Sequence, residues 1–243
     1  MIALFTDFGA DDIYVAQLKA ALLKHAPAGT PIIDLLHSVP NFDARAGAHL
    51  LAALQAWLPL GTVFLAVVDP GVGSARDAVV LEADGKWYVG PDNGLLSVIG
   101  ARASRARTWR IIWRPQRLSA SFHGRDLFAP MAGRIAGGTL PAGELEETTQ
   151  LNVRLGPDGL AEVIYIDHYG NGLTGLTASN VSPSAALQVG AHRLSYGRVF
   201  AEVSTGSAFW YEDSVGLVEI AVSHGSARDE LGLQIGDPVK VIG

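Results

Sequence analysis

"TVFLAVVDPGVGSAR", residues 62–76, joins an apolar run to a loop that holds two glycines, one proline, one carboxylate and one guanidinium. The run 62–69 predicts a buried β-strand that ends at Asp69. Glycine-rich loops after strands commonly bind phosphate, but this loop lacks the Lys-Ser/Thr pair of a phosphate loop and carries an acid that would repel phosphate. The stretch therefore predicts a strand of an α/β sheet that presents Asp69 and Arg76 to another kind of ligand.

The flanking sequence alternates apolar runs with helix-like stretches, at residues 2–6, 11–25, 31–36 and 41–59. Strands separated by helices favour a mainly parallel sheet whose faces are covered by the helices. Ligands of such sheets bind beyond the carboxyl ends of the strands. We therefore expect Asp7 and Asp69, each at the end of an apolar run, to lie near one another at one edge of the sheet.

The texture of the sequence changes in the second half of the chain. Residues 137–150 contain Gly, Pro and acids without an apolar period and are predicted to form a linker. Short β-like runs follow, separated by Gly and Ser, at residues 161–167, 197–203, 215–222 and 238–243. We therefore expect an α/β N-terminal domain over residues 1–140 and a smaller, all-β, barrel-like C-terminal domain over residues 150–243.

Composition excludes several classes of function. The 243 residues carry a net charge of −6 and no basic stripe, which argues against nucleic acid as a partner. The absence of cysteine excludes disulfides and thiolate metal sites. No uncharged apolar stretch reaches the roughly 18 residues of a membrane span, and Asp7 comes too early for a signal peptide. The expected location is the cytoplasm, without contact with a membrane.

Taken by pattern alone, the candidate residues keep alternative interpretations. Asp69 and Arg76 equally fit a surface turn with a local ion pair. A lone histidine such as His123 is more often structural, although the following Gly124 would allow close approach to a ligand. The side chain of Asp7 is suited to accept hydrogen bonds from both hydroxyls of a ribose, because Asp7 ends a buried strand and stands before a glycine.

The acids and amides further along the chain are open to similar alternatives. Asp11 and Asp12 fit helix capping. Asp167 and Asn171 fit an ordinary hairpin turn. Glu219 lies within an apolar strand and needs a partner if its side chain points inward.

Taken together, seven motifs in this order closely resemble one family. They are "TDFGADDIYVAQLKA", "HSVPNFD", "VDPGVGSAR", "GPDNGLL", "FHGRD", "YIDHYGN" and "DSVGLVEIAVSHGSA". The sequence resembles the S-adenosyl-L-methionine (SAM) hydroxide adenosyltransferases, a family that also contains the SAM-dependent fluorinase and chlorinase. The resemblance implies an α/β N-terminal domain, a β-barrel C-terminal domain and a homotrimer. It also implies that each active site lies between the N-terminal domain of one subunit and the C-terminal domain of the next.

The resemblance assigns Asp69, Arg76 and His123 as catalytic residues, as in the hydrolase branch. The fluorinase branch has a Tyr at the position of Asp69 and a Tyr-Ser pair at His123-Gly124. The implied substrate-binding residues are Asp7, Asp12, Phe42, Asp69, Asp167, Asn171, Ser214, Glu219 and Val222.

Their implied roles divide along the substrate. Asp7 would hold the ribose and Phe42 would pack on the nucleoside. The methionine end would lie near Asp12, Asp167 and Ser214, and the adenine near Asn171, Glu219 and the main chain of Val222. The halogenases have an Arg after the serine where this chain has Val215, so the group that recognises the methionine carboxylate is unassigned.

The expected reaction is hydrolysis of SAM to adenosine and L-methionine, with no metal and no cofactor. Asp69 and His123 would orient and partly deprotonate a water aimed at C5′ of the ribose. Three alternatives are a halogenase of the same family, a non-catalytic adenosine or SAM sensor, and a metal-dependent hydrolase. The last would be built on Asp7, Asp11, Asp12 and His123.

Overall fold

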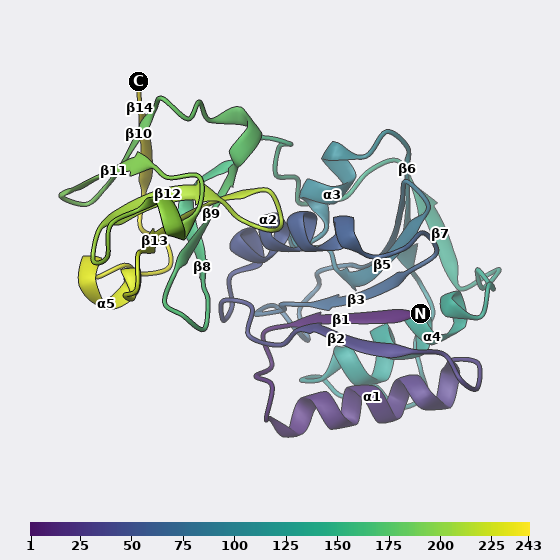
Figure 1. The fold of residues 1–243 in the computed structure, drawn as a ribbon. Coiled ribbons are helices and arrows are strands. Elements are labelled where there is room, and N and C mark those ends of the chain that lie inside the picture. The colour runs from purple at the N-terminus through teal and green to yellow at the C-terminus, as the bar shows by residue number, and fades with distance from the viewer. The chain divides into compact units, whose positions relative to one another are not determined.

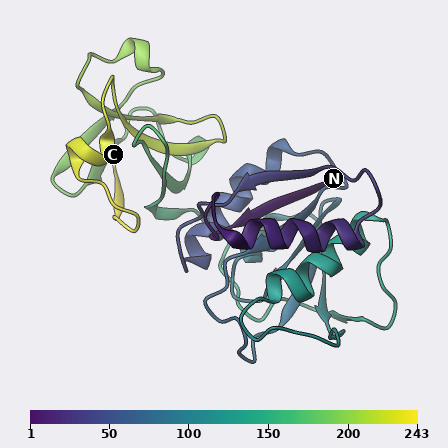
Figure 2. The same ribbon diagram turned by 90° about the horizontal axis from the view of Figure 1, so that it is seen from below.

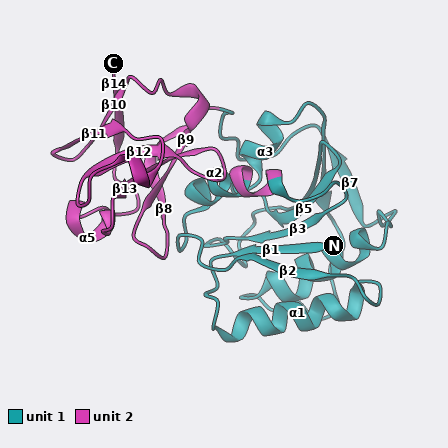
Figure 3. Cartoon of the chain, in the orientation of Figure 1, with its two compact units in different colours: residues 1–51, 57–157 teal, residues 52–56, 158–243 magenta.

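The computed structural model describes residues 1–243, which fold into two compact units. Unit 1 comprises residues 1–51 and 57–157, and unit 2 comprises residues 52–56 and 158–243 (Figure 3). Each unit contains one seven-stranded sheet. None of the helices is both long and apolar enough to span a membrane.

The sheet of unit 1 is mixed, in the order β2-β1-β3-β5-β4-β6-β7. Its strands are β1 (Ile2–Thr6), β2 (Ile32–Leu36), β3 (Val63–Val67), β4 (Ala78–Ala83), β5 (Lys86–Pro91), β6 (Ala106–Ile111) and β7 (Leu145–Thr148). β2, β1, β3 and β5 are parallel neighbours. The pairs β5-β4, β4-β6 and β6-β7 are antiparallel. The expectation of a mainly parallel sheet is therefore wrong.

A two-residue turn explains the antiparallel half. Asp84 and Gly85 have φ of 46° and 81° and join β4 directly to β5, with Ala83 paired to Lys86. Asp-Gly is a preferred dipeptide for such tight hairpin turns, because both central residues need positive φ. A strand that returns at once through a hairpin can pair only antiparallel.

The segment 137–150 also differs from expectation, because it contains the edge strand β7 rather than being only a linker. β7 pairs with β6, and ion pairs join Arg107 to Glu147 and Arg110 to Glu146 across the two strands. These pairs replace the apolar alternation that would have marked the strand in the sequence.

Helices cover the sheet of unit 1. They are α1 (Ile13–His25), α2 (Ala44–Leu54), α3 (Ser97–Arg102), the π-helical turn η2 (Gly124–Phe128) and α4 (Ala129–Ala136). The short helix η1 (Gln55–Trp57) follows α2, whose last residues, from 52 on, belong to unit 2. Figures 1 and 2 show α1 and α4 side by side against one face of the sheet. Leu22 of α1, Leu65 of β3 and Met131 of α4 belong to one fully buried apolar cluster. Burial of each such side chain stabilises the fold by about 1.5–3 kcal/mol.

The register of β1 and β3 determines which residues emerge together at one edge of the sheet. β1 and β3 are parallel and in register, with Thr6 beside Val67. Because both strands end at the same level, the residues that follow them, Asp7 and Asp69, emerge at the same edge.

Unit 2 is a nearly closed β-barrel, as expected for the C-terminal domain. Its strands run in the order β14-β10-β11-β12-β13-β9-β8. They are β8 (Leu160–Ile166), β9 (Gly172–Thr177), β10 (Ala186–Val189), β11 (His192–Tyr196), β12 (Ala208–Glu212), β13 (Leu217–Val222) and β14 (Val239–Ile242), with the short helices η3 (Ala178–Asn180), η4 (Phe200–Glu202) and α5 (Ala227–Leu231). Val163 donates to the carbonyl of Asp237 (2.9 Å) and accepts from Gly236 (2.8 Å), which ties β8 to the segment before β14.

Candidate active site

The loop after β3 folds back so that Arg76 reaches Asp69. Gly73, with φ of 80°, lets this loop approach the segment before His123. A Cβ at Gly73 would lie 2.5 Å from the carbonyl oxygen of Ala120. The glycine therefore permits a close contact between the loop that carries Arg76 and the loop that carries His123.

Asp69, Arg76 and His123 form one hydrogen-bonded group. Arg76 donates from Nε to Asp69 Oδ1 at 2.8 Å and from Nη2 to Asp69 Oδ2, a bidentate ion pair. The same Nη2 lies 3.1 Å from Nδ1 of His123. The side chains of Asp69 and Arg76 are only 5% and 10% exposed. Three residues that are distant in sequence thus meet in a buried arrangement whose geometry is fixed by the guanidinium.

The guanidinium also determines the state of the imidazole. Arginine can only donate, so Nδ1 of His123 accepts and we assign the proton of the neutral ring to Nε2. Burial and the positive charge of Arg76 lower the pKa of His123 below its usual value of 6.5. His123 is therefore a neutral hydrogen-bond donor at pH 7. With Nδ1 occupied, the geometry does not support the expectation that His123 takes part in deprotonating water.

A cavity of about 240 Å³ in unit 1 brings these groups together with the predicted nucleoside site. It is lined by Asp7, Phe8, Tyr14, Asn41, Phe42, Val67, Asp69, Val72, Ser121, Phe122, His123 and Gly124. The predicted residues Asp7, Phe42, Asp69 and His123 all share this wall. Arg76 reaches it through Asp69 and His123.

Three aromatic side chains of this cavity were not predicted from the sequence. The ring of Tyr14 lies 5.9 Å from Phe8 and 5.2 Å from Phe122, and Phe8 lies 5.7 Å from Phe122. Such a cluster offers ring faces and edges to a flat heterocycle or to a cation. The sequence gives little indication of this cluster, because Phe8 and Tyr14 lie in a motif whose acidic residues are the more obvious candidates for function.

Asp7 is held by the main chain across the cavity. Its Oδ2 accepts a hydrogen bond of 3.0 Å from the backbone N–H of Phe42. Burial raises the pKa of Asp7, and the nearby Asp69 adds to that rise, while the Phe42 hydrogen bond opposes it. Phe42 itself has φ of 65° and a side chain that is largely exposed beside the cavity. A positive φ at an aromatic residue is strained, and such strain concentrates at ligand sites.

Asp12 lies apart from this group. It is exposed, forms the N-cap position of α1 without a capping hydrogen bond, and does not line the cavity. Nor do Asp7, Asp11, Asp12 and His123 gather as ligands, since no group of three or more His, Asp or Glu side chains in the structure is arranged to hold a metal ion. The arrangement of these side chains therefore does not support the metal-dependent alternative.

The remaining predicted residues line one hollow of about 710 Å³ in unit 2. They are Asp167, Asn171, Ser214, Glu219 and Val222, and their neighbours in the wall include Tyr169, Phe200, Tyr211 and His224. Asp167 closes the β8–β9 turn by accepting from the backbone N–H groups of Tyr169 (2.9 Å) and Asn171 (2.8 Å). The turn interpretation is therefore correct, and the same turn presents polar groups to the hollow.

Glu219 is the buried acid of this hollow. It is 5% exposed and lies opposite Tyr211 on the neighbouring strand. Burial, reinforced by the carboxylates of Asp213 and Asp167, raises the pKa of Glu219 to about 7, although hydrogen bonds with Tyr211 and Asn171 oppose the rise. The carboxyl group can therefore act as donor or acceptor near neutral pH.

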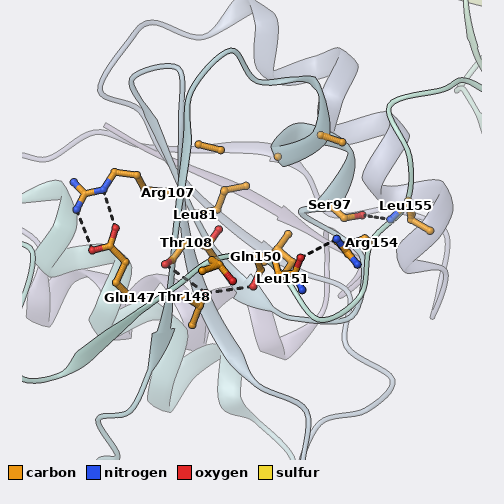
Figure 4. A pocket seen from close by; sticks show the side chains of 14 residues that line it. Leu81, Ser97, Arg107, Thr108, Glu147, Thr148, Gln150, Leu151, Arg154 and Leu155 are labelled. Carbon is orange, nitrogen blue, oxygen red and sulfur yellow. Dashed lines mark hydrogen bonds and ion pairs between the residues drawn. The ribbon is translucent and has the colours of Figure 1, made fainter.

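A further cavity of about 580 Å³ in unit 1 differs in chemistry (Figure 4). Its polar side chains are hydrogen-bonded within its own wall, Arg107 to Glu147, Arg154 to Gln150, and Ser97 to the backbone of Leu155. Its only carboxylate, Glu147, is already paired with Arg107, and no histidine lines it. The cavity around Asp69 is therefore the candidate active site.

Comparison with known proteins agrees with this geometry. The profile of the SAM hydroxide adenosyltransferase N-terminal domain matches residues 2–146, and that of the C-terminal domain matches residues 161–240. An "(R)-S-adenosyl-L-methionine hydrolase" of Thermus thermophilus is 41% identical, over 98% of this chain and 97% of its own. A fluorinase of Actinopolyspora mzabensis is 24% identical, over 99% of this chain and 96% of its own.

A solved structure shows the same fold. The crystal structure of an uncharacterized conserved protein from Thermotoga maritima superimposes with a TM-score of 0.87, at 30% identity and with full coverage of both chains. Both domain profiles, a full-length relative and the Asp-Arg-His arrangement point the same way. The chain belongs to the SAM hydroxide adenosyltransferase family.

Proposed function

We propose that the protein hydrolyses SAM to adenosine and L-methionine. The observation that carries the proposal is the arginine that bridges an aspartate and a histidine on the wall of a nucleoside-sized cavity. The 41% identical hydrolase supports the same reaction. The (R) in that relative's name leads us to propose this configuration at sulfur for the substrate.

The reaction needs a positioned nucleophile more than an acid. The oxygen of water forms a bond to C5′ of the ribose while the C5′–sulfur bond breaks and its electron pair stays on sulfur. The leaving group is the neutral thioether of methionine, so it needs no proton. The oxygen attached to C5′ loses one proton to the carboxylate of Asp69, which later releases it to solvent, and adenosine results. Alignment of water opposite the sulfur is the main demand on the protein.

In this mechanism each member of the Asp-Arg-His group has a distinct task. The carboxylate of Asp69 accepts a hydrogen bond from the water and draws off its proton. Nε2–H of His123 donates to the same oxygen and sets its direction. Arg76 fixes both partners. Arg76 balances the charge of Asp69, so the carboxylate of Asp7 gives the cavity its net negative charge, which suits a cationic sulfonium and would repel a phosphate.

Asp7 holds the ribose hydroxyls and Phe42 packs on the nucleoside in this proposal. Asn171, Glu219 and the main chain of Val222 hold the adenine, and Asp167 and Ser214 lie at the methionine end. Val215 donates its backbone N–H to Asp213 at 2.8 Å and offers no cation to the methionine carboxylate. Asp12 stays a candidate for the methionine end only by resemblance.

We further propose that the protein works as a homotrimer without metal or cofactor, with each active site shared between two subunits. The division of the proposed ligand residues between two units supports this, because neither hollow alone holds all of them. Neither nucleic acid nor a membrane is a proposed partner.

Incubation of the purified protein with each sulfur diastereomer of SAM in ¹⁸O-water tests the reaction. The proposal predicts adenosine whose 5′-oxygen carries ¹⁸O, formed faster from the (R) diastereomer. Adenosine with an unlabelled 5′-oxygen would overturn the mechanism. Tight retention of adenosine without turnover would favour a sensor, and 5′-halo-5′-deoxyadenosine on addition of fluoride or chloride would favour a halogenase.

A further inference from the structure

A buried histidine outside the candidate active site is tied to the turn that carries Asp7. His37 is 5% exposed and follows β2, next to β1 in the sheet. Its Nδ1 lies 2.8 Å from Oγ1 of Thr6, a side chain with no exposed surface. Its Nε2 lies 3.1 Å from Oδ1 of Asp34, which also binds Lys19 at 2.7 Å.

The direction of the hydrogen bond between Thr6 and His37 can be assigned. Nε2 of His37 is within ion-pair distance of Asp34 but lacks hydrogen-bond geometry. The neighbouring carboxylate favours the proton on Nε2, so Nδ1 offers a lone pair. The hydroxyl of Thr6 therefore donates to Nδ1. The oxygen of that hydroxyl in turn accepts a hydrogen bond of 3.3 Å from the backbone N–H of Phe8. Burial alone would raise the pKa of Asp34, but the hydrogen bond from Lys19 and the proximity of His37 leave it lowered, which keeps this carboxylate ionised.

The backbone of His37 also binds this turn, at its other end. The carbonyl of His37 accepts from the backbone N–H of Gly9 at 2.7 Å. Thr6 and Gly9 flank Asp7 on either side, and both are bonded to this one residue. The chain that continues from His37 delivers the N–H of Phe42 to the carboxylate of Asp7.

We propose that His37 is a positioning residue that aims the carboxylate of Asp7 at the ribose hydroxyls. This rests on the proposed function, in which Asp7 is the acceptor for those hydroxyls. A carboxylate that accepts from two hydroxyls needs both of its oxygens in a fixed plane. Loss of the side-chain hydrogen bond between His37 and Thr6 loosens the turn on one side of Asp7 and misdirects the carboxylate, even though the carbonyl of His37 still binds Gly9.

The experiment compares the binding of adenosine with that of 2′,3′-dideoxyadenosine by calorimetry. The wild type is expected to prefer adenosine by about 10- to 100-fold, since charge-assisted hydrogen bonds exist only with the former. In His37→Phe this preference should shrink to within about 3-fold through weaker adenosine binding. A merely structural role would weaken both ligands alike and would leave the ratio intact.

Two further variants keep the inference testable if His37→Phe folds poorly. Thr6→Val removes the hydroxyl at nearly constant volume and should lower the same ratio, whereas Thr6→Ser keeps the hydroxyl and should restore it. His49→Phe is the matched control, because His49 is also 5% exposed but lies on α2 and lines neither ligand hollow. It should keep the wild-type ratio.

The outcomes separate the two proposals. A wild type that binds both nucleosides equally contradicts the ribose role of Asp7 and hence the proposed function of that residue. A wild type that discriminates, together with His37→Phe and Thr6→Val variants that discriminate as well, overturns the inference about His37 and leaves the proposed function standing.

Discussion

Asp69 and Arg76 are an ion pair that is hard to explain by stability alone. Both side chains are nearly buried. The desolvation of two charges offsets most of their attraction, so a buried pair contributes little net stability, whereas removal of one partner costs about 3–5 kcal/mol. At a cavity wall, the pair instead provides a carboxylate whose two oxygens cannot rotate.

Asp69→Asn should reduce adenosine formation by at least about 10²-fold, because the amide cannot take up the proton of water. Binding of adenosine should change little, since the ribose and adenine contacts are made elsewhere. Product analysis and calorimetry measure the two effects. Glu147→Gln, which removes a carboxylate from the exposed pair with Arg107, is the control and should keep full activity. Undiminished turnover in Asp69→Asn would refute the role of Asp69.

The pH dependence of the reaction should reflect His123. Its pKa is lowered by burial and by Arg76, and only the neutral ring accepts the hydrogen bond from Arg76. Activity should therefore persist as the pH falls through 6.5 and decline only at lower pH. A profile of kcat/KM against pH measures this. An acid limb centred at or above 6.5, or one that survives in His123→Gln, would show that another group is titrating.

Glu219 should make unit 2 less stable at higher pH. Its pKa is raised from 4.5 to about 7, so the stability that it contributes is complete below pH 4.5 and is lost as the pH rises through 7. A shift of this size corresponds to roughly 3 kcal/mol in the free energy of unfolding. Urea unfolding at a series of pH values should show this decline in the wild type and a flatter curve in Glu219→Gln. Parallel curves would argue that Glu219 is not the responsible group.

At the level of elements, the site depends on how two loops meet. The loop after β3 and the segment before η2 approach so closely at Gly73 and Ala120 that no side chain fits between them. The hydrogen bond between Arg76 and His123 spans these same two loops.

Gly73→Ala should therefore separate the loops and lower turnover as well as stability. Gly138→Ala is the matched control, because Gly138 has nearly the same φ, 78° against 80°, but nothing within 4 Å of an added Cβ. Both changes should cost about 1 kcal/mol through the positive φ, as thermal unfolding measures. Only Gly73→Ala should also lose activity. Equal activity of the two variants would contradict the importance of the close contact.

The elements also show what the sequence could predict. Strands such as 62–69 were predicted because their apolar runs are local signals, and the parallel register of β1 and β3 then brings Asp7 to the side of Asp69. The antiparallel half of the sheet in unit 1 was not predicted, although the dipeptide Asp84-Gly85 is typical of a hairpin turn. β7 was not predicted, because its acidic side chains pair with arginines of β6 and show no apolar alternation. The aromatic cluster of Phe8, Tyr14 and Phe122 could not be predicted, because it depends on packing between distant segments.

At the scale of the whole molecule, the proposed ligand residues are divided between two units. Asp7 and Phe42 line the cavity of unit 1, and Asn171 and Glu219 line the hollow of unit 2. In the proposed trimer each active site would combine unit 1 of one subunit with unit 2 of its neighbour.

Co-expression of Asp69→Asn with Glu219→Ala tests this arrangement. Each variant alone should be inactive, but every mixed trimer would contain one intact active site out of three. Random assembly of equal amounts should therefore restore about a quarter of wild-type activity. Light scattering gives the number of subunits, and adenosine formation gives the activity. No recovery in mixed trimers would mean that each site lies within one chain.

The two outermost strands of the sheet in unit 1 both carry acids. β2 has Asp34 at its centre, and β7 has Glu146 and Glu147. Free backbone groups along an outer strand can recruit a strand from another molecule, and charges there oppose such recruitment. Replacing Glu146 and Glu147 with valine would create an outer strand free of charge. The enzyme would then be expected to precipitate on concentration or mild heating, even though its catalytic groups were untouched.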